Sequence, residues 1–273
     1  MTNAPYLRRH RAHSPPDDLR VGRFSHLRYN PSSFLEGGDS HLVINAVLFD
    51  LDGTLRISIP GGMEMFLEYA RRLGIAVNET NAQAGARWNH WYFAQSPALL
   101  EDLALGDEMA LWTRYSARLL EAVGVTETSD ARARAITEQF ADYAPRSQLN
   151  DGAFDTLVGL KAAGFKLGLV SNRRNPLDQA VAELGLEGMF AFTLAAGQVG
   201  IWKPDPGLLR EAMERGNCDP SRTAYVGDNF YADIVGARRA GVTPVLLDPQ
   251  TIFPDADCMI IHHLTELLDW LVR

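Results

Sequence analysis

The sequence predicts an α/β protein: a doubly wound parallel sheet with an inserted α-helical bundle. An apolar, β-prone run over residues 42–49 has the composition of a strand that is buried on both faces. From residue 151 onward, strand and helix patterns alternate, which is typical of a parallel sheet with helices on both faces. The helical segment between these regions is much longer than the roughly dozen residues that a parallel crossover needs. We therefore expect a separate inserted domain.

The composition is that of a globular protein and disfavours several functional classes. The 273 residues are 46% hydrophobic and carry a formal net charge of −8, which disfavours a nucleic-acid partner. The two cysteines, Cys218 and Cys258, are too few for a disulfide scaffold or a cysteine-based zinc site. No apolar run is long enough to cross a bilayer, and the first residues lack a secretory signal. We therefore expect a cytoplasmic protein without a membrane partner.

The same patterns divide the chain into an arm, a core domain and a cap domain. Residues 1–41 are predicted to form a flexible N-terminal arm, because they are basic and lack apolar periodicity. A docking segment or an organelle address is the alternative, although the acidic pair at positions 17 and 18 disfavours a transit peptide. Residues 42–57 and 148–273 are predicted to form the core domain, and residues 58–147 the α-helical cap domain. The oligomeric state stays open.

Several helix signals lie in the predicted core domain, between strands expected at residues 165–170, 224–226 and 242–247. Asn175 and Asp205 each precede a proline, as helix N-caps do when proline takes the first helical position. Further helices are expected at residues 232–240 and 265–272, and on the apolar face of Phe154, Leu157 and Val158.

The inserted segment carries apolar stripes at helical spacing. The stripes are Phe66, Tyr69, Ala70 and Leu73; then Met109, Trp112, Ser116, Leu119 and Val123; and then Ile136, Phe140 and Tyr143. The aromatic run at residues 88–93 predicts another helix, whose rings form bundle core or, as the less favoured alternative, line a substrate pocket. Successive amphipathic helices predict a small bundle, inserted where it could act as a lid.

Polar side chains in four segments follow predicted strands or precede helices. The segments are Asp50-Leu51-Asp52-Gly53-Thr54, Ser171-Asn172, Lys203-Pro204, and Gly227-Asp228-Asn229 with Asp233 behind it. Because parallel strands end at one edge of a sheet, we expect these groups to converge there. Close carboxylates repel one another unless a cation lies among them, and hard oxygen ligands suit Mg²⁺. Taken singly, each segment could instead be an ordinary turn, helix cap or surface loop.

The order and spacing of the four segments resemble the haloacid dehalogenase (HAD) superfamily of phosphatases. The resemblance extends from about residue 42 to the end of the chain. It implies a Rossmann-like core, and the inserted helices are similar to the α-helical cap of subfamily I (C1) members, among them phosphoglycolate-phosphatase-like enzymes. One departure is Arg56-Ile57-Ser58, where many members carry an acidic or small polar residue, and it bears on the substrate class.

The resemblance implies two catalytic carboxylates and a metal site. Asp50 would attack phosphorus and form an aspartyl-phosphate. Asp52 would protonate the leaving alcohol and later activate water, which would require a rise of about 3 in its pKa for the acid role at neutral pH. Mg²⁺ would be held by the carboxylates of Asp50 and Asp228 and by the backbone carbonyl of Asp52.

The resemblance also implies groups that hold the phosphoryl oxygens and support the metal site. Thr54, Ser171, Asn172 and Lys203 would bind phosphate, and Asn229 and Asp233 would stand behind the metal ligands. The neighbouring Arg56, Arg173 and Arg174 could contact substrate or be solvated, and the residue pattern favours neither alternative.

The expected function is that of an Mg²⁺-dependent phosphatase that hydrolyses a small phosphorylated metabolite. A phosphosugar mutase of the same fold, which returns the phosphoryl group to a sugar, is one alternative. A catalytically silent, HAD-derived binding module is another. The presence of Asp52 favours phosphoryl transfer over dehalogenation, because hydrolysis of a haloacid ester does not require that acid.

Overall fold

The computed structural model describes residues 44–126 and 128–272, which form two compact units. One unit holds residues 44–61 and 145–272 and contains the main sheet, and we call it the sheet unit. The other holds the described residues of 62–144 and is helical, and we call it the helical unit. The predicted arm lies outside the described residues.

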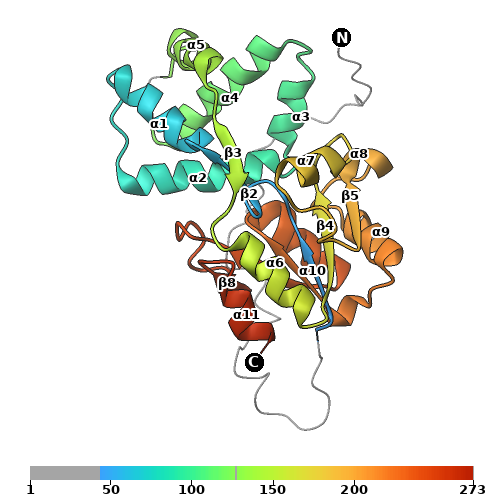
Figure 1. The fold of residues 1–273 in the computed structure, drawn as a ribbon. Coiled ribbons are helices and arrows are strands. Elements are labelled where there is room, and N and C mark those ends of the chain that lie inside the picture. The colour runs from blue at the N-terminus through green and yellow to red at the C-terminus, as the bar shows by residue number, and fades with distance from the viewer. Residues whose placement is uncertain (1–43, 127, 273) are drawn as a thin grey trace. The chain divides into compact units, whose positions relative to one another are not determined.

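The sheet unit is built on six parallel strands in the order β5-β4-β1-β6-β7-β8. The strands are β1 (Ala46–Phe49), β4 (Lys166–Ser171), β5 (Phe192–Ala195), β6 (Thr223–Gly227), β7 (Thr243–Leu247) and β8 (Met259–Ile261). All four residues of β1 are buried, because this strand has neighbours on both edges and helices on both faces. The predicted doubly wound parallel sheet is confirmed (Figure 1).

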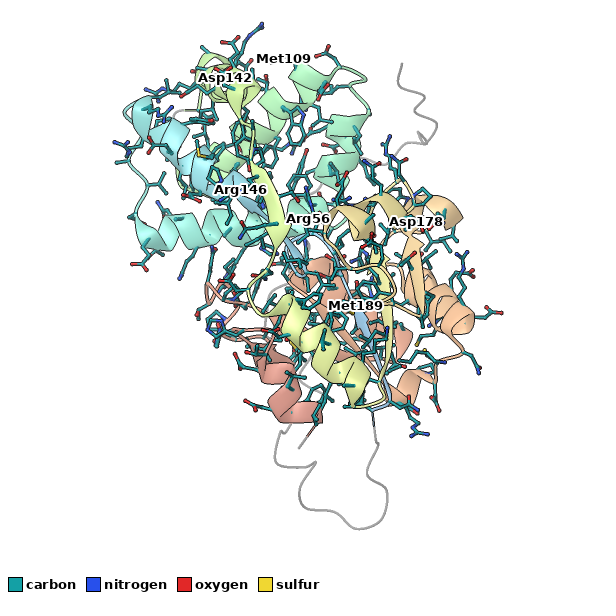
Figure 2. All side chains as sticks on the ribbon, viewed as in Figure 1. Arg56, Met109, Asp142, Arg146, Asp178 and Met189 are labelled. Atoms are coloured by element: carbon teal, nitrogen blue, oxygen red, sulfur yellow. The ribbon has the colours of Figure 1, made fainter. Side chains whose placement is uncertain are left out.

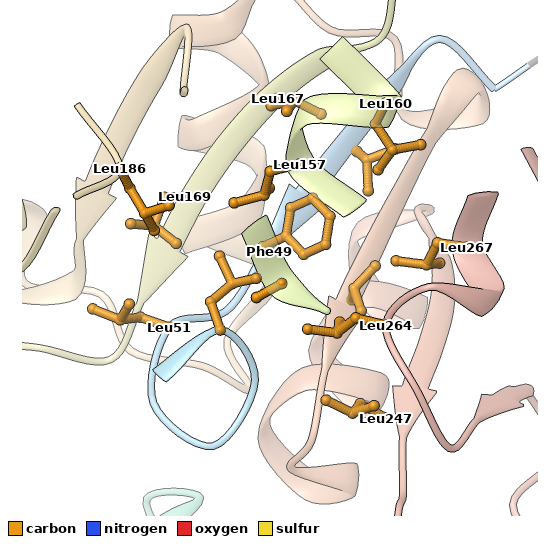
Figure 3. Close-up of a cluster of buried hydrophobic side chains, with 14 of the residues drawn as sticks. Phe49, Leu51, Leu157, Leu160, Leu167, Leu169, Leu186, Leu247, Leu264 and Leu267 are labelled. Carbon is orange, nitrogen blue, oxygen red and sulfur yellow. The ribbon is translucent and has the colours of Figure 1, made fainter. Parts of the chain in front are cut away.

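Helices cover the two faces of this sheet. They are α6 (Ala153–Ala162), α7 (Asp178–Glu183), α8 (Ala196–Val199), α9 (Pro206–Gly216), α10 (Val235–Ala240) and α11 (Glu266–Leu271), with short turns η4 (Pro220–Arg222) and η5 (Phe230–Ile234). Phe49 of β1 packs with Leu157 and Leu160 of α6 and with Leu267 of α11 on one face (Figure 3). Residues of α9 and α10 form a second core on the other face.

Two helix predictions in this unit need correction. The helix α7 begins at Asp178, with Leu177 rather than Asn175 at its N-cap. The Arg173 carbonyl, in the loop before it, accepts from the Gly197 N–H of α8. The helix α6 packs through the stripe that includes Leu157 and Leu160, so the predicted face members Phe154 and Val158 are exposed. The N-cap at Asp205 is confirmed, since its carboxylate accepts from Gly207 N.

A separate antiparallel pair of strands also belongs to the sheet unit. It consists of β2 (Arg56–Ile59) and β3 (Arg146–Leu149), and Ile59 pairs with Arg146 at its open end. The chain between residues 62 and 144 therefore leaves and re-enters the sheet unit through neighbouring strands.

The helical unit is a bundle of short helices, as predicted. They are α1 (Gly62–Arg72), α2 (Glu79–Phe93), α3 (Pro97–Leu103), α4 (Glu108–Ala122) and α5 (Asp130–Gln139), followed by the turn η3 (Phe140–Asp142). Side chains of Asn78, Ser96, Asp107 and Ser129 cap four of these helices by accepting from the backbone. The predicted apolar stripe on α4 is only partly buried. Ser116, Leu119 and Val123 are buried, whereas Met109 (Figure 2) and Trp112 are exposed.

Trp88, Trp91 and Tyr92 of the aromatic run on α2 pack into the bundle, whereas Phe93 is exposed. The ring of Tyr92, which is fully buried, stacks on Trp88 at 5.0 Å and contacts Tyr115 at 5.1 Å. Its hydroxyl donates to the carboxylate of Asp102, which is also fully buried. Within residues 44–126 and 128–272, every helix is too short or too polar to cross a bilayer.

Candidate functional site

The four polar segments meet at the carboxyl edge of the main sheet. Asp50 directly follows β1, Ser171 ends β4 and Asp228 directly follows β6. These three strands are neighbours, and their paired residues bring the three strand ends to the same level. Lys203 reaches the group from the loop between α8 and α9. The convergence predicted from the shared edge of the parallel strands is confirmed.

Three carboxylates form the acidic centre of this group. Oxygens of Asp50, Asp228 and Asp233 all lie within 4.8 Å of one another. Burial raises the pKa of Asp50 to about 7, although Lys203 acts in the opposite direction. Burial also raises the pKa of Asp228 well above its usual range, and the charges of Asp233 and Asp50 add to this rise. The cluster therefore resists carrying its full negative charge without a cation.

One buried ammonium group balances part of this charge. The Lys203 Nζ lies 2.6 Å from Asp50 Oδ1, 2.7 Å from Asp233 Oδ1 and 2.8 Å from the Tyr225 hydroxyl. Burial lowers the pKa of Lys203, but the charges of Asp233 and Asp50 outweigh it and raise that pKa well above its usual value. All three donors of the ammonium have acceptors. Lys203 therefore acts as a fixed positive charge between the carboxylates.

The side chain of Asn172 fixes the backbone of Lys203. Its Oδ1 accepts from Lys203 N at 2.7 Å, and its Nδ2 donates to Lys203 O at 3.0 Å. Tyr225, which was not among the predicted site residues, contacts the ammonium end of the Lys203 side chain. Its hydroxyl accepts from Lys203 Nζ and donates to Val170 O at 3.0 Å. Ser171, on β4 beside these groups, is buried.

The carboxylate of Asp228 is held by the segment that follows β1. The hydroxyl of Thr54 donates to Asp228 Oδ1 at 3.0 Å, and the carbonyl of Thr54 accepts from Asn150 Nδ2 at 2.9 Å. This contact joins two segments that are 174 positions apart in the sequence.

Two glycines leave the space that these carboxylates occupy. A Cβ atom at Gly53 would lie 2.3 Å from Asp228 Oδ2, and Gly53 also has a φ of +89°. A Cβ atom at Gly227 would lie 2.3 Å from Asp233 Oδ2. Any side chain at either position would displace a carboxylate of the cluster.

Asn229 and Asp233 support the site from the turn η5. Asn229 Oδ1 accepts from the backbone N–H groups of Tyr231 and Ala232, which caps the turn. Asp233 Oδ2 accepts from Asn229 N at 2.9 Å, while its Oδ1 accepts from Lys203. Both oxygens of Asp233 are thus engaged by hydrogen bonds from the protein.

Asp52 lies beside the cluster and is bound by two arginines. Arg173 donates through Nε to Oδ2 at 2.6 Å and through Nη2 to Oδ1 at 2.8 Å, and Arg56 donates through Nη1 to Oδ1 at 2.6 Å. Burial raises the pKa of Asp52, but the hydrogen bonds and charges of these arginines outweigh burial and lower it below its usual value. The expected rise in this pKa is therefore wrong for the structure described. Of the alternatives left open for Arg56 and Arg173, simple solvation is wrong, because both form ion pairs with Asp52.

The donor set of the site fits a hard divalent cation. Asp50, Asp228 and Asp233 with Lys203 carry a formal charge of −2 when all are ionised, so a dication would neutralise the group. Carboxylate oxygens are the ligands that Mg²⁺ takes in proteins. Because both oxygens of Asp233 accept hydrogen bonds from the chain, the carboxylates of Asp50 and Asp228 are the better ligand candidates.

A doubly wound sheet with clustered carboxylates and a lysine at its carboxyl edge defines an α/β enzyme, and comparison with known proteins identifies the family. The model of the haloacid dehalogenase-like hydrolases matches residues 44–241, and the chain belongs to this family of hydrolases. A phosphoserine phosphatase from Thermus thermophilus is 32% identical over 221 residues, or 74% of this chain and 88% of the relative.

Two further proteins are similar to this chain, one in sequence and one in fold. Phosphoglycolate phosphatase 1 from Pseudomonas aeruginosa is 27% identical over 239 residues, which are 81% of this chain and 78% of the relative. A solved HAD-hydrolase from Bacillus subtilis with bound magnesium superposes with a TM-score of 0.52 at 22% identity, covering 85% of this chain and all of that one. The last likeness concerns the fold alone.

Proposed function

We propose that this hydrolase is a Mg²⁺-dependent phosphatase that cleaves a small organic phosphate monoester through an aspartyl-phosphate on Asp50. The observation that carries this proposal is the contact of the buried Asp50 carboxylate with the Lys203 ammonium, at the edge of the sheet where Asp228 also lies. The named activities of the phosphatase relatives support the same reaction class.

The reaction would proceed in two steps on the side chains of the sheet unit. In the first, a carboxylate oxygen of Asp50 bonds to phosphorus while the bond from phosphorus to the substrate alcohol breaks. In the second, water attacks the phosphorus, the bond to Asp50 breaks, and inorganic phosphate leaves. Lys203 would hold Asp50 in place during both steps, since its ammonium is fixed by three acceptors.

Asp52 would exchange protons with the leaving alcohol and with the attacking water. The carboxylate bound by Arg56 and Arg173 is already in the form that accepts a proton from water. The acid role requires a proton on the same group, which both arginines oppose. Substrates whose leaving groups are weak bases need that proton least.

A bound Mg²⁺ would neutralise the carboxylates and stabilise the charge that develops on the phosphoryl oxygens. Asp50 and Asp228 would hold it, and the backbone carbonyl of Asp52 is the further ligand that the family resemblance implies. Thr54 would orient Asp228 by the hydrogen bond between their side chains. Ser171 and the backbone N–H groups of Thr54 and Asn172 remain the proposed phosphate contacts.

The first experiment measures release of p-nitrophenol from p-nitrophenyl phosphate. We expect turnover with Mg²⁺, its loss with EDTA, and its loss in Asp50→Asn. The matched control is Asp155→Asn, which changes an exposed aspartate of α6 and should retain wild-type turnover. Absence of metal-dependent turnover, with this substrate and with a panel of phosphorylated metabolites, would contradict the proposal. Transfer of phosphate to a second sugar position instead of water would indicate a mutase.

A further inference from the structure

The contacts of Asp52 carry an inference about residues that the family motifs do not include. Both carboxylate oxygens of Asp52 accept hydrogen bonds from Arg173, in the parallel two-bond geometry that fixes a carboxylate plane. Arg56 adds a second bond to Oδ1. An aspartate at a partly exposed position ordinarily samples several rotamers. Here three hydrogen bonds hold one of them.

The chain also holds the two arginines in place. The carbonyl of Arg173 accepts from Gly197 N at 2.9 Å, and a Cβ atom at Gly197 would lie only 2.0 Å from the carbonyl oxygen of Arg174. The Arg173 loop can therefore lie this close to α8 only because residue 197 has no side chain.

Arg56 is fixed from the other side of Asp52. Its backbone N–H donates to Leu51 O at 2.8 Å, and its carbonyl accepts from Gly53 N at 2.8 Å. Its Nε donates to the hydroxyl of Ser147 on β3. The turn that carries Asp52 thus folds back so that Arg56, labelled in Figure 2, reaches the carboxylate.

Stability alone does not account for this arrangement. The side chains of Asp52, Arg56 and Arg173 are 41%, 27% and 33% exposed, and ion pairs that water reaches contribute little to folding. The three hydrogen bonds instead fix the direction in which the Asp52 carboxylate points.

We propose that Arg173, supported by Arg56, is a positioning residue that aligns the Asp52 carboxylate for proton transfer. This inference rests on the proposed phosphatase function, in which Asp52 exchanges the proton. Alignment of a reacting group accounts for a large share of enzymatic rate enhancement. Loss of the two hydrogen bonds from Arg173 to Asp52 should therefore slow turnover more than it weakens substrate binding. Lysine at position 173 keeps the charge but cannot make the two parallel bonds.

A double-mutant cycle separates this role from direct contact with substrate. With Mg²⁺ and the alkyl phosphate of the metabolite panel that wild type hydrolyses fastest, we expect Arg173→Ala to lower kcat about tenfold or more, within the range of general acid–base effects, and to leave KM within about threefold. The loss should be smaller with p-nitrophenyl phosphate, whose leaving group is a weak base. Arg173→Lys should recover only part of kcat. In the Asp52→Asn background, Arg173→Ala should cause less than about a twofold further loss, because the group it aligns is absent. Arg215→Ala, which changes an exposed arginine of α9 away from the site, is the control and should equal wild type.

The opposite pattern would overturn the inference. A raised KM with unchanged kcat, or losses that multiply in Asp52→Asn/Arg173→Ala, would show that Arg173 binds substrate itself. A crystal structure of Arg173→Ala gives a readout that does not depend on activity. We expect Asp52 to occupy other or multiple rotamers there, and an unchanged single rotamer would overturn the positioning role. Wild-type protein without phosphatase activity would contradict the proposed function, and the crystal structure would still test the alignment.

Discussion

At the scale of single residues, the site depends on groups that make room as much as on groups that react. Gly53 and Gly227 have no side chain, and each faces a carboxylate oxygen at a distance that no Cβ atom could tolerate. The acidic cluster can therefore be as compact as it is only with glycine at both positions.

Gly53→Ala should damage the site more than its backbone conformation explains. The added Cβ would displace Asp228, so we expect loss of turnover and of any stabilisation by Mg²⁺. Gly164→Ala is the matched control, because Gly164 has nearly the same φ (+88° against +89°) but no heavy atom within 4 Å of the new Cβ. The control should cost about 1 kcal/mol of backbone strain and keep activity. Equal effects in activity and in thermal unfolding would contradict this prediction.

Tyr225→Phe removes one acceptor from the Lys203 ammonium and one donor from the Val170 carbonyl. Because both partners are buried, we expect the free energy of unfolding to fall by about 1–3 kcal/mol. We also expect turnover to fall while Asp50 remains able to react. Urea unfolding and steady-state kinetics check the two effects, and a variant as stable as wild type would show that the hydroxyl is dispensable.

The effect of Mg²⁺ on stability should depend on pH through Asp50. The folded-state pKa of Asp50 is raised from 3.8 to about 7, so its contribution to the stability of the metal-free protein is lost as the pH rises through 7. A cation binds the ionised carboxylate and competes with the proton. The rise in Tm on adding Mg²⁺ should therefore be larger at pH 8 than at pH 6, and Asp50→Asn should reduce this difference.

The sequence predicted which polar residues lie together at the edge of the sheet but not all of their partners. Parallel strands end at one edge of a sheet, so Asp50 and Asp228, which each follow a predicted strand, could be expected to lie near one another. Tyr225 lies within an apolar strand, and the apolar pattern of that strand does not show that its hydroxyl contacts Lys203. The meeting of Asp52 with Arg173, 121 positions away, depends on a loop whose path the sequence does not reveal.

At the scale of elements, predictions succeeded where the chain has an unbroken apolar run or a clear signal at the start of a helix. The strand β4 and the start of α9 are examples. The prediction of the buried face failed on α6. This helix has apolar residues on most of its sides, so its sequence does not show which of them face the sheet. The short helix α3 was not predicted, although Ser96 and Pro97 form a recognisable N-terminal signal.

In the helical unit, Asp102 joins α3 to the helices beside it. Its buried carboxylate accepts from the Tyr92 hydroxyl on α2 and from Arg118 on α4. Asp102→Ala would leave both donors without this acceptor, and we expect a loss of about 2–4 kcal/mol in the free energy of unfolding. Asp107→Ala, which removes an exposed helix cap, should cost about 1 kcal/mol. Similar losses in the two variants, measured by urea unfolding, would contradict the structural role of Asp102.

At the scale of the whole molecule, the groups proposed for chemistry all lie in the sheet unit. Replacing residues 60–145 by an Asn-Gly turn would join β2 to β3 as a hairpin, since Ile59 already pairs with Arg146. We expect the shortened protein to fold cooperatively and to be stabilised by Mg²⁺, as measured by calorimetry. A shortened chain that does not fold would show that the sheet unit depends on the helical unit for its stability.

The β2–β3 pair also has an evolutionary consequence. An insertion whose two ends are adjacent paired residues can be lengthened, shortened or exchanged by recombination without a change of register in the main sheet. Mutations can therefore accumulate in residues 62–144 at a different rate from those that surround Asp50. The gene can thus diversify one unit while inheritance preserves the chemistry of the other.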